Sequence, residues 1–274
     1  MKQIKKILVP TDFSESATQA FLFAQKLAND FGATLKLIHV YKTDLGVPVP
    51  ETMAFQLLEA RKEEALHKME SFLKKANSTL KIETVVEMGF ASDLLIDYSK
   101  NKKEEIDLII MGTKGEHNIA EMILGSVSTA VIRDAACPVL AIPENCKDDD
   151  IKEIAYATDL KSDNADSLKE AAEIAKLFSA LLYCVTVDIF GDNNSIEKNR
   201  FIALITEKGI DTNLTEIKSD TVEHGLDTYI HENGIDMLIM YRPHRTFFEK
   251  IFHSSTTKQV ALHSSVPLLV FKKP

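Results

Sequence analysis

The chain has 274 residues, a formal net charge of −9, 45% hydrophobic residues and three cysteines. This length fits one large or two modest domains, and the longest apolar runs are strand-sized, short of the roughly 20 residues that a membrane-spanning helix needs. An acidic chain without a basic stripe lacks the attraction that supplies most nonspecific affinity for nucleic acids. The composition therefore excludes a fibrous, disordered or membrane-spanning protein and argues against nucleic acid as a partner.

In chain order, apolar runs of buried-strand type alternate with stretches of helical period, which is typical of a parallel sheet covered by helices on both faces. We predict strands at residues 4–9, 34–40, 82–87, 106–111, 138–142, 153–157, 181–187, 213–217, 236–240 and 267–271. We predict helices at residues 15–31, 54–77, 91–102, 119–134, 164–178, 195–208, 222–233 and 248–262. The Gly- and Pro-containing stretch 42–52 indicates a surface loop that could act as a lid.

The sequence also resembles itself at a period of about half its length. Residues 7–12 open the first half and residues 154–159 open the second, each as an apolar strand that ends in Thr-Asp. Residues 137–142 and 266–271 close the halves, each with a proline just before a short apolar strand. Duplication is the simplest explanation.

A polar, charged stretch at residues 144–150 is typical of an exposed linker between two domains. We therefore predict domains at residues 1–146 and 151–274. The predicted fold class is α/β, with two tandem open parallel five-stranded sheets flanked by helices.

The N-terminus and the cysteines indicate the compartment. The early lysines precede only the short apolar run Ile7 to Pro10, which is too brief for a secretory signal, so we expect a first strand there. Cys137, Cys146 and Cys184 are widely spaced and odd in number, which supports neither a disulfide framework nor a metal knuckle. We expect a cytoplasmic protein.

The stretch after the fourth predicted strand carries the chemistry. Gly112 and Gly115 are followed, after nine residues, by Gly125 and Ser126, with Ser128 close behind. Glycines can adopt positive φ and let the backbone approach a ligand, so that successive N–H groups form an anion-binding nest. The N-terminus of the following helix adds its dipole, and the two serine hydroxyls add donors. We predict that a polyphosphate binds here.

This Gly-x2-Gly-x9-Gly-Ser spacing resembles the phosphate-binding signature of ATP-binding universal stress proteins. The strand end Pro10-Thr11-Asp12 and the terminal strand at Cys137-Pro138-Val139 are similar to that family too, and the resemblance extends more weakly over the second half. It implies an adenine nucleotide alpha hydrolase-like, Rossmann-like fold that binds ATP, with or without Mg²⁺. Asp12 and Val40 would contact adenine or ribose, and the glycines and serines would hold the phosphates. The implied site residues are Pro10, Thr11, Asp12, Val40, Met111, Gly112, Lys114, Gly115, Gly125, Ser126, Val127 and Ser128.

The predicted positions agree with the general geometry of open parallel sheets, whose ligand crevice lies beyond the carboxyl ends of the strands. For two of these side chains a role other than ligand binding also fits. Asp12 also fits an N-cap of the helix that starts near Ser14, and it could serve both purposes. Lys114 could add a charge to the phosphates or lie in solvent.

The second half departs from this pattern, because Tyr241, His244 and Ser254 stand where the first half has its three glycines. Their side chains would fill the space that phosphate needs, and Pro243 removes one N–H donor. Asp159 remains as a cap or packing residue. We predict that the second domain has a degenerate motif and binds no ATP.

Five of the eight histidines lie in the second half, but without a tight ligand spacing, a cysteine or a paired carboxylate beside them. We therefore expect no metal site. Arg242 and Arg245 could instead bind a smaller anion in the altered loop.

ATP binding does not imply turnover, since phosphoryl transfer needs positioned metal ligands and a group that orients the nucleophile, and the sequence shows neither convincingly. We expect a nucleotide-dependent switch or sensor in the stress response, at most a weak ATPase, acting on an unidentified protein partner. A nucleotide-independent scaffold and a slow ATP hydrolase are the alternatives. The apolar strand 139–142 needs covering, which residues 268–271 could provide in an intramolecular pseudo-dimer, and a further homodimer is compatible with this.

Overall fold

The computed structural model divides into two compact units, an N-terminal unit of residues 3–144 and a C-terminal unit formed mainly by residues 145–274. Each unit is described by itself. The described residues are 3–42, 50–76, 79–113, 125–144, 146, 150–160, 165–189, 191, 195–242 and 266–272.

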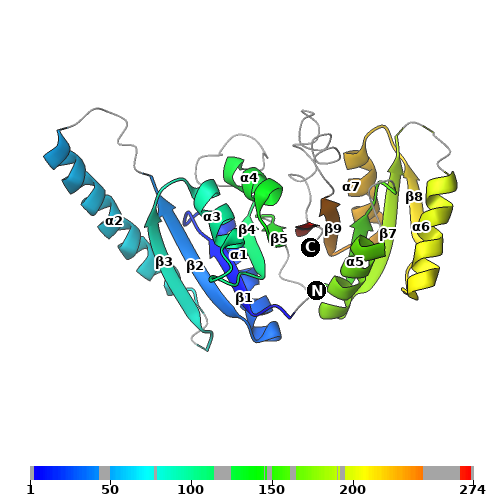
Figure 1. Ribbon diagram of the computed structural model, residues 1–274, viewed down its shortest axis with the longest axis horizontal. Coiled ribbons are helices and arrows are strands. Elements are labelled where there is room, and N and C mark those ends of the chain that lie inside the picture. Colours follow the sequence, from blue (N-terminus) through cyan, green and yellow to red (C-terminus); the bar gives the residue numbers. More distant parts are fainter. Residues whose placement is uncertain are drawn as a thin grey trace. The chain divides into compact units, whose positions relative to one another are not determined.

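The N-terminal unit is an open, fully parallel sheet in the strand order β3-β2-β1-β4-β5, with helices on both faces (Figure 1). Since β1 lies between β2 and β4, the chain builds the sheet first to one side of β1 and then to the other, which creates a switch point at the carboxyl ends of β1 and β4. Its elements are β1 (Lys6–Pro10), α1 (Glu15–Phe31), β2 (Thr34–Tyr41), α2 (Glu51–Leu73), β3 (Ile82–Met88), α3 (Ala91–Lys100), β4 (Leu108–Gly112), α4 (Ser126–Asp134) and β5 (Val139–Ile142).

The C-terminal unit has the same plan, with a parallel sheet in the order β10-β9-β6-β7-β8. Within the described residues each unit therefore holds five parallel strands, and the predicted α/β class with two five-stranded sheets is confirmed. The helix predicted at 248–262 lies outside the described residues. The elements are β6 (Glu153–Ala157), α5 (Ala165–Leu177), β7 (Leu181–Asp188), α6 (Ser195–Lys208), β8 (Leu214–Lys218), α7 (Val222–Asn233), β9 (Met237–Arg242) and β10 (Leu268–Lys272).

The C-terminal end of α2 packs on α1 in the N-terminal unit, where the rings of Phe21 and Phe72 lie 5.2 Å apart between centroids. Helix α3 is tied instead to the end of α4, where the Ala136 N–H donates to Ser99 Oγ at 2.9 Å. Helices thus cover both faces of the sheet. Strands β1, β4 and β5 are buried as near-continuous apolar runs, whereas the edge strand β3 is only partly buried.

The duplication extends to backbone detail after the first strand of each unit. Phe13 and Leu160 both adopt positive φ, at 69° and 61°. In each unit the preceding threonine hydroxyl, of Thr11 or Thr158, accepts a hydrogen bond from that residue's N–H at 2.9 Å. A short hydroxyl–backbone bond of this kind stabilises a tight turn that is costly for a side chain other than glycine.

A second feature repeated in both units is an aspartate just before β4 and just before β9. Asp107 Oδ2 accepts hydrogen bonds from two successive backbone N–H groups at the start of β1, and Asp236 Oδ2 does the same at the start of β6, at 2.8–3.0 Å. These carboxylates satisfy backbone donors that the ladder leaves unpaired, so the register at the amino ends of the strands is set alike in both units.

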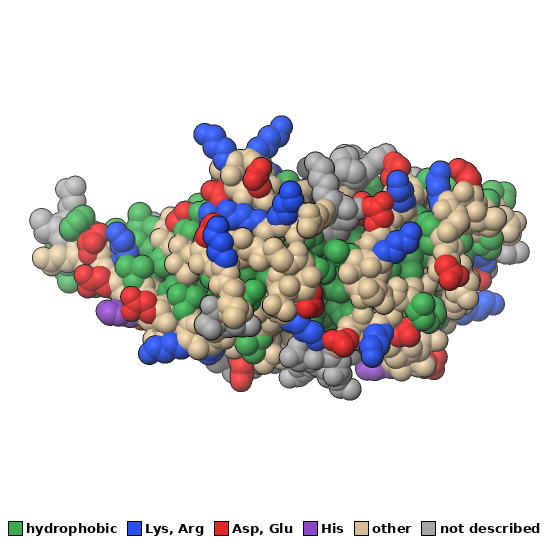
Figure 2. All heavy atoms as spheres, turned by 90° about the horizontal axis from the view of Figure 1, so that it is seen from below, with side chains coloured by type: hydrophobic (Ala, Val, Ile, Leu, Met, Phe, Trp, Pro, Cys, Tyr) green, Lys and Arg blue, Asp and Glu red, His purple; other side chains and the backbone are tan. Residues whose placement is uncertain are grey.

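On the face shown in Figure 2, the basic and acidic side chains of the described residues are interspersed rather than gathered by sign. No helix within the described ranges is both long and apolar enough to cross a bilayer.

Candidate functional site

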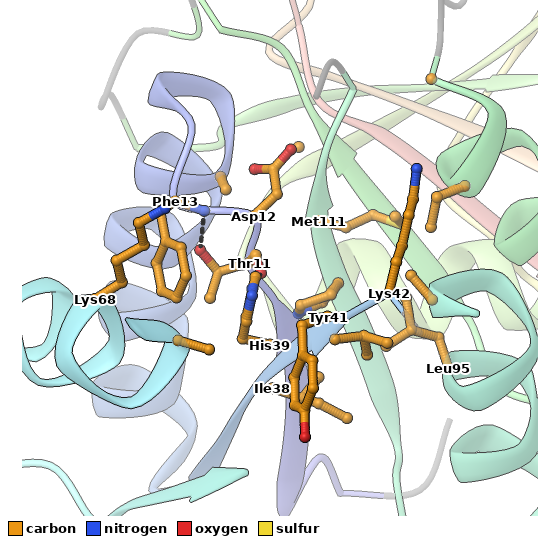
Figure 3. A pocket seen from close by; sticks show the side chains of 18 of the residues that line it. Thr11, Asp12, Phe13, Ile38, His39, Tyr41, Lys42, Lys68, Leu95 and Met111 are labelled. Carbon is orange, nitrogen blue, oxygen red and sulfur yellow. Dashed lines mark hydrogen bonds between the residues drawn. The ribbon is translucent and has the colours of Figure 1, made fainter. Parts of the chain in front are cut away.

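A cavity of about 580 Å³ opens at the carboxyl ends of β1, β2 and β4 in the N-terminal unit (Figure 3). The first turns of α1, α3 and α4 and one face of α2 complete its walls. The volume lies in the range of small-molecule sites. This cavity is lined by ten of the twelve site residues that were predicted from the sequence. They are Pro10, Thr11, Asp12, Val40, Met111, Gly112, Gly125, Ser126, Val127 and Ser128. Lys114 and Gly115 lie outside the described residues.

The sequence interpretation missed the wall that α2 contributes. Arg61, Glu64, Ala65 and Lys68 all line the cavity, and their spacing of three and four residues places them on one face of the helix. That spacing was readable, but the sequence does not show which face of α2 meets the crevice. Other missed lining residues come from the β1–α1 turn and the end of β2: Phe13, Ile38, His39, Tyr41 and Lys42.

The β1–α1 turn fixes Asp12 at the mouth of the cavity (Figure 3). The Thr11 N–H donates to the carbonyl of Ile38 at 2.8 Å, which ties the turn to β2. Asp12 Oδ1 accepts from the Ser14 N–H at 3.1 Å, and Ser14 Oγ accepts from the Ala17 N–H at 3.2 Å. The N-cap of α1 is therefore Ser14, and the alternative that Asp12 caps this helix is wrong.

His39 forms part of the floor between β1 and β2. Its Nδ1 lies 2.8 Å from the Thr11 carbonyl oxygen; since a carbonyl only accepts, Nδ1 carries the proton and donates. The His39 ring packs on Phe13 with centroids 4.3 Å apart, and Phe13 contacts Phe72 of α2 at 5.7 Å. These contacts hold the turn with positive φ against both β2 and α2.

The N-terminus of α4 forms the opposite wall. Gly125 is its N-cap with φ −56° and no capping side-chain hydrogen bond, and the Gly125 N–H donates to the Thr113 carbonyl at 2.8 Å. Of the helix expected at 119–134, residues 119–124 lie outside the described residues; α4 itself begins at Ser126, because the backbone of Gly125 is extended. The first N–H groups of a helix lack an intrahelical acceptor, so this wall offers donors and a positive dipole end to an anion.

The structure corrects the roles expected for two kinds of residue in the Gly-x2-Gly-x9-Gly-Ser signature, the glycines and the serines. Neither Gly112 nor Gly125 has positive φ. A Cβ at Gly112 would meet the Ser16 side chain and come within 2.8 Å of the Ser16 carbonyl, so glycine here permits close packing of α1 on β4. The buried Ser128 hydroxyl donates to the Gly112 carbonyl at 3.0 Å, so its proton binds the protein rather than a ligand.

Cationic side chains gather on the α2 side and at the end of β2. Lys68 forms an ion pair with Glu64 at 2.8 Å, one helical turn apart, and the hydrogen bond from Lys68 lowers the pKa of the Glu64 carboxyl. Arg61 Nη1 donates to the Lys42 carbonyl at 3.0 Å, which attaches α2 to the end of β2. Three cations and two carboxylates thus line a cavity in a chain that is acidic as a whole.

The universal stress protein family matches residues 3–143 and 195–272 of the chain. The chain belongs to the universal stress protein family. Over its full length it is similar to universal stress protein Slr1230 of Synechocystis, with 27% identity over 98% of this chain and 100% of that protein. Universal stress protein MJ0531 of Methanocaldococcus jannaschii is 33% identical over 53% of this chain and 85% of its own length.

Among solved structures, a universal stress protein from Archaeoglobus fulgidus aligns with 99% of this chain and 97% of its own, with a TM-score of 0.72 and 22% identity. This likeness concerns the fold. The two-unit fold of this chain is therefore similar to that of a solved universal stress protein.

The C-terminal unit of this universal stress protein fills the corresponding place with an aromatic side chain. Tyr241 pairs with Phe271 in the register in which Gly112 pairs with Ile142. The Tyr241 ring lies 5.5 Å from that of Phe271 and is 7% exposed, so it is packed. The predictions on the Arg242 side chain and on Pro243, His244, Arg245 and Ser254 fall outside what the structure describes.

Proposed function

We propose that this universal stress protein binds ATP, with or without Mg²⁺, in its N-terminal domain and acts as a nucleotide-dependent switch in the cytoplasmic stress response. The observation that carries the proposal is a single cavity in which Asp12 and Val40, at the strand ends, face the uncapped N-terminus of α4. One side of this cavity suits a nucleoside and the other suits its phosphates.

The two ends of the cavity support one orientation of the ligand. Ile38, Leu95 and Met111 give the strand end an apolar surface for a base, and the nearby Asp12 carboxylate can accept hydrogen bonds from ribose hydroxyls. The phosphates then lie at Gly125 and the first turn of α4, where donors and the helix dipole favour negative charge.

ATP in this position would act by linking elements that are far apart in the sequence. It would contact the ends of β1 and β2 on one side and α4 on the other, and so favour the arrangement in which all three are in place. A ligand shifts a conformational equilibrium only through such a difference in affinity between states, and no hydrolysis is needed for it.

The proposal assigns ATP to the domain of residues 1–146 and leaves the domain of residues 151–274 with a degenerate motif, because Tyr241 occupies the place of Gly112. The association of residues 139–142 with 268–271 in a pseudo-dimer, a homodimer and an unidentified protein partner stay predictions from the sequence.

Thermal unfolding of wild type, Ser126→Asp and Ser126→Ala, each with and without Mg-ATP, tests the ATP site. Ser126 is the exposed first residue of α4, so a carboxylate there stabilises the free helix by roughly 0.3–1 kcal/mol while it repels phosphate. ATP at 100 times its dissociation constant should stabilise wild type by about 2.7 kcal/mol.

We expect wild type and Ser126→Ala to gain stability with ATP, and Ser126→Asp to fold at least as stably as wild type but to gain nothing. If ATP does not stabilise wild type, the ATP site is refuted and the nucleotide-independent scaffold stands. An equal gain in Ser126→Asp would show that the phosphates do not lie at α4.

A further inference from the structure

Lys42 follows directly on β2 and lines the cavity together with the first turn of α4. Figure 3 shows its side chain running along the cavity past Met111, on the side opposite Lys68 and Asp12. The side chain is exposed, and its ammonium group forms no ion pair within the part of the chain that the structure describes. An exposed ammonium group that lines the same cavity as the first turn of a helix is an arrangement that favours an anion.

The other two cations of the cavity already have partners, so Lys42 is the candidate for binding an anion. Lys68 is already paired with Glu64, and Figure 3 places Lys68 beside Phe13, on the side of α2. Arg61 donates through Nη1 to the Lys42 carbonyl. That bond fixes the backbone from which the Lys42 side chain extends.

The C-terminal unit provides an internal comparison. The strand registers align Pro10 with Ala157 and Ile38 with Val185, so Lys42 corresponds to Ile189. Ile189 is exposed and cannot bind an anion. The unit in which Tyr241 fills the place of Gly112 therefore also lacks this cation.

We propose that Lys42 binds the phosphates of the nucleotide at the N-terminus of α4 and makes the site selective for nucleotides with more phosphates, and that Arg61 is the positioning residue that holds Lys42 in place. This inference rests on the proposed nucleotide site and names a cation that lies outside the Gly-x2-Gly-x9-Gly-Ser signature. A charge-assisted contact of this kind contributes roughly a tenfold or greater preference.

Isothermal titration of adenosine, AMP, ADP and ATP into the full chain tests the inference. Lys42→Gln removes the charge, Lys42→Arg keeps it, and Lys62→Gln is the matched control, because Lys62 is an exposed cation of α2 outside the cavity. Wild-type affinity should rise from adenosine to ATP. Lys42→Gln should lose about tenfold or more for ATP and nothing for adenosine, whereas Lys42→Arg and Lys62→Gln should resemble wild type.

A double-mutant cycle tests the role of Arg61. Arg61→Gln should lower the ratio of ATP to AMP affinity in the wild-type background and leave it unchanged in the Lys42→Gln background, because Arg61 acts through Lys42. An effect of equal size in both backgrounds would overturn the positioning role.

The outcomes separate this inference from the proposed function. Wild type that binds ATP, with Lys42→Gln unchanged, overturns the inference and leaves the ATP site standing. Equal losses for ATP and adenosine would show that Lys42 acts through the fold, which also overturns it. Wild type that binds no ATP overturns both.

Discussion

Replacing Gly112 by alanine tests whether this glycine serves the packing of α1 or the ligand. The added Cβ would lie 2.8 Å from the carbonyl carbon and oxygen of Ser16, in the first turn of α1. Backbone atoms at that distance cannot turn away as a side chain does, so α1 has to move off β4 by several tenths of an ångström. Overpacking of this kind typically costs about 1–3 kcal/mol.

The assay is urea unfolding without nucleotide, with Gly125→Ala as the matched control from the same signature. With φ −56°, Gly125 is compatible with alanine, so its replacement should cost less than about 1 kcal/mol, the loss expected at an N-cap. At an m value near 2 kcal/mol per molar, Gly112→Ala should lower the midpoint of the N-terminal unit by about 0.5–1.5 M. If Gly112→Ala unfolds like wild type without nucleotide but binds ATP poorly, the packing explanation is wrong and the glycine serves the ligand.

Two further predictions concern titratable groups. The hydrogen bond from Lys6, at 3.0 Å, lowers the pKa of Glu83 from its usual 4.5, so this pair stabilises the fold at neutral pH and loses its effect as the pH falls through the folded-state pKa, below 4.5. Glu83→Gln should cost under about 1 kcal/mol at pH 7, because the pair is partly exposed, and nothing at pH 2; a difference that persists in urea unfolding at pH 2 would contradict this. Burial raises the pKa of the Cys137 thiol to about 12, so at pH 8 iodoacetamide should alkylate Cys137 far more slowly in the native protein than in urea. Mass spectrometry of the labelled peptides would show this, and equal rates would refute it.

The helix boundaries show where local signals suffice. Helix α1 spans the predicted residues 15–31, because Ser14 caps its start and Gly32, at φ 65°, ends it. Helix α2 starts at Glu51 rather than 54, directly after Pro50. Proline needs no N–H partner at a helix start, so Pro50 is a start signal within the stretch 42–52 that is predicted as a loop.

The sequence by itself determined the fold class, because buried-strand runs, helical periods and turn residues are local properties that recur in both halves. It also predicted that Asp12 and Val40 lie at strand ends, since parallel strands bring their carboxyl ends to one edge. Only the tertiary structure decided that Arg61 and Lys68 of α2 form a wall of the cavity, and that Gly112 faces Ser16. These are contacts between elements distant in sequence, and close packing, unlike periodicity, depends on the three-dimensional approach of both partners.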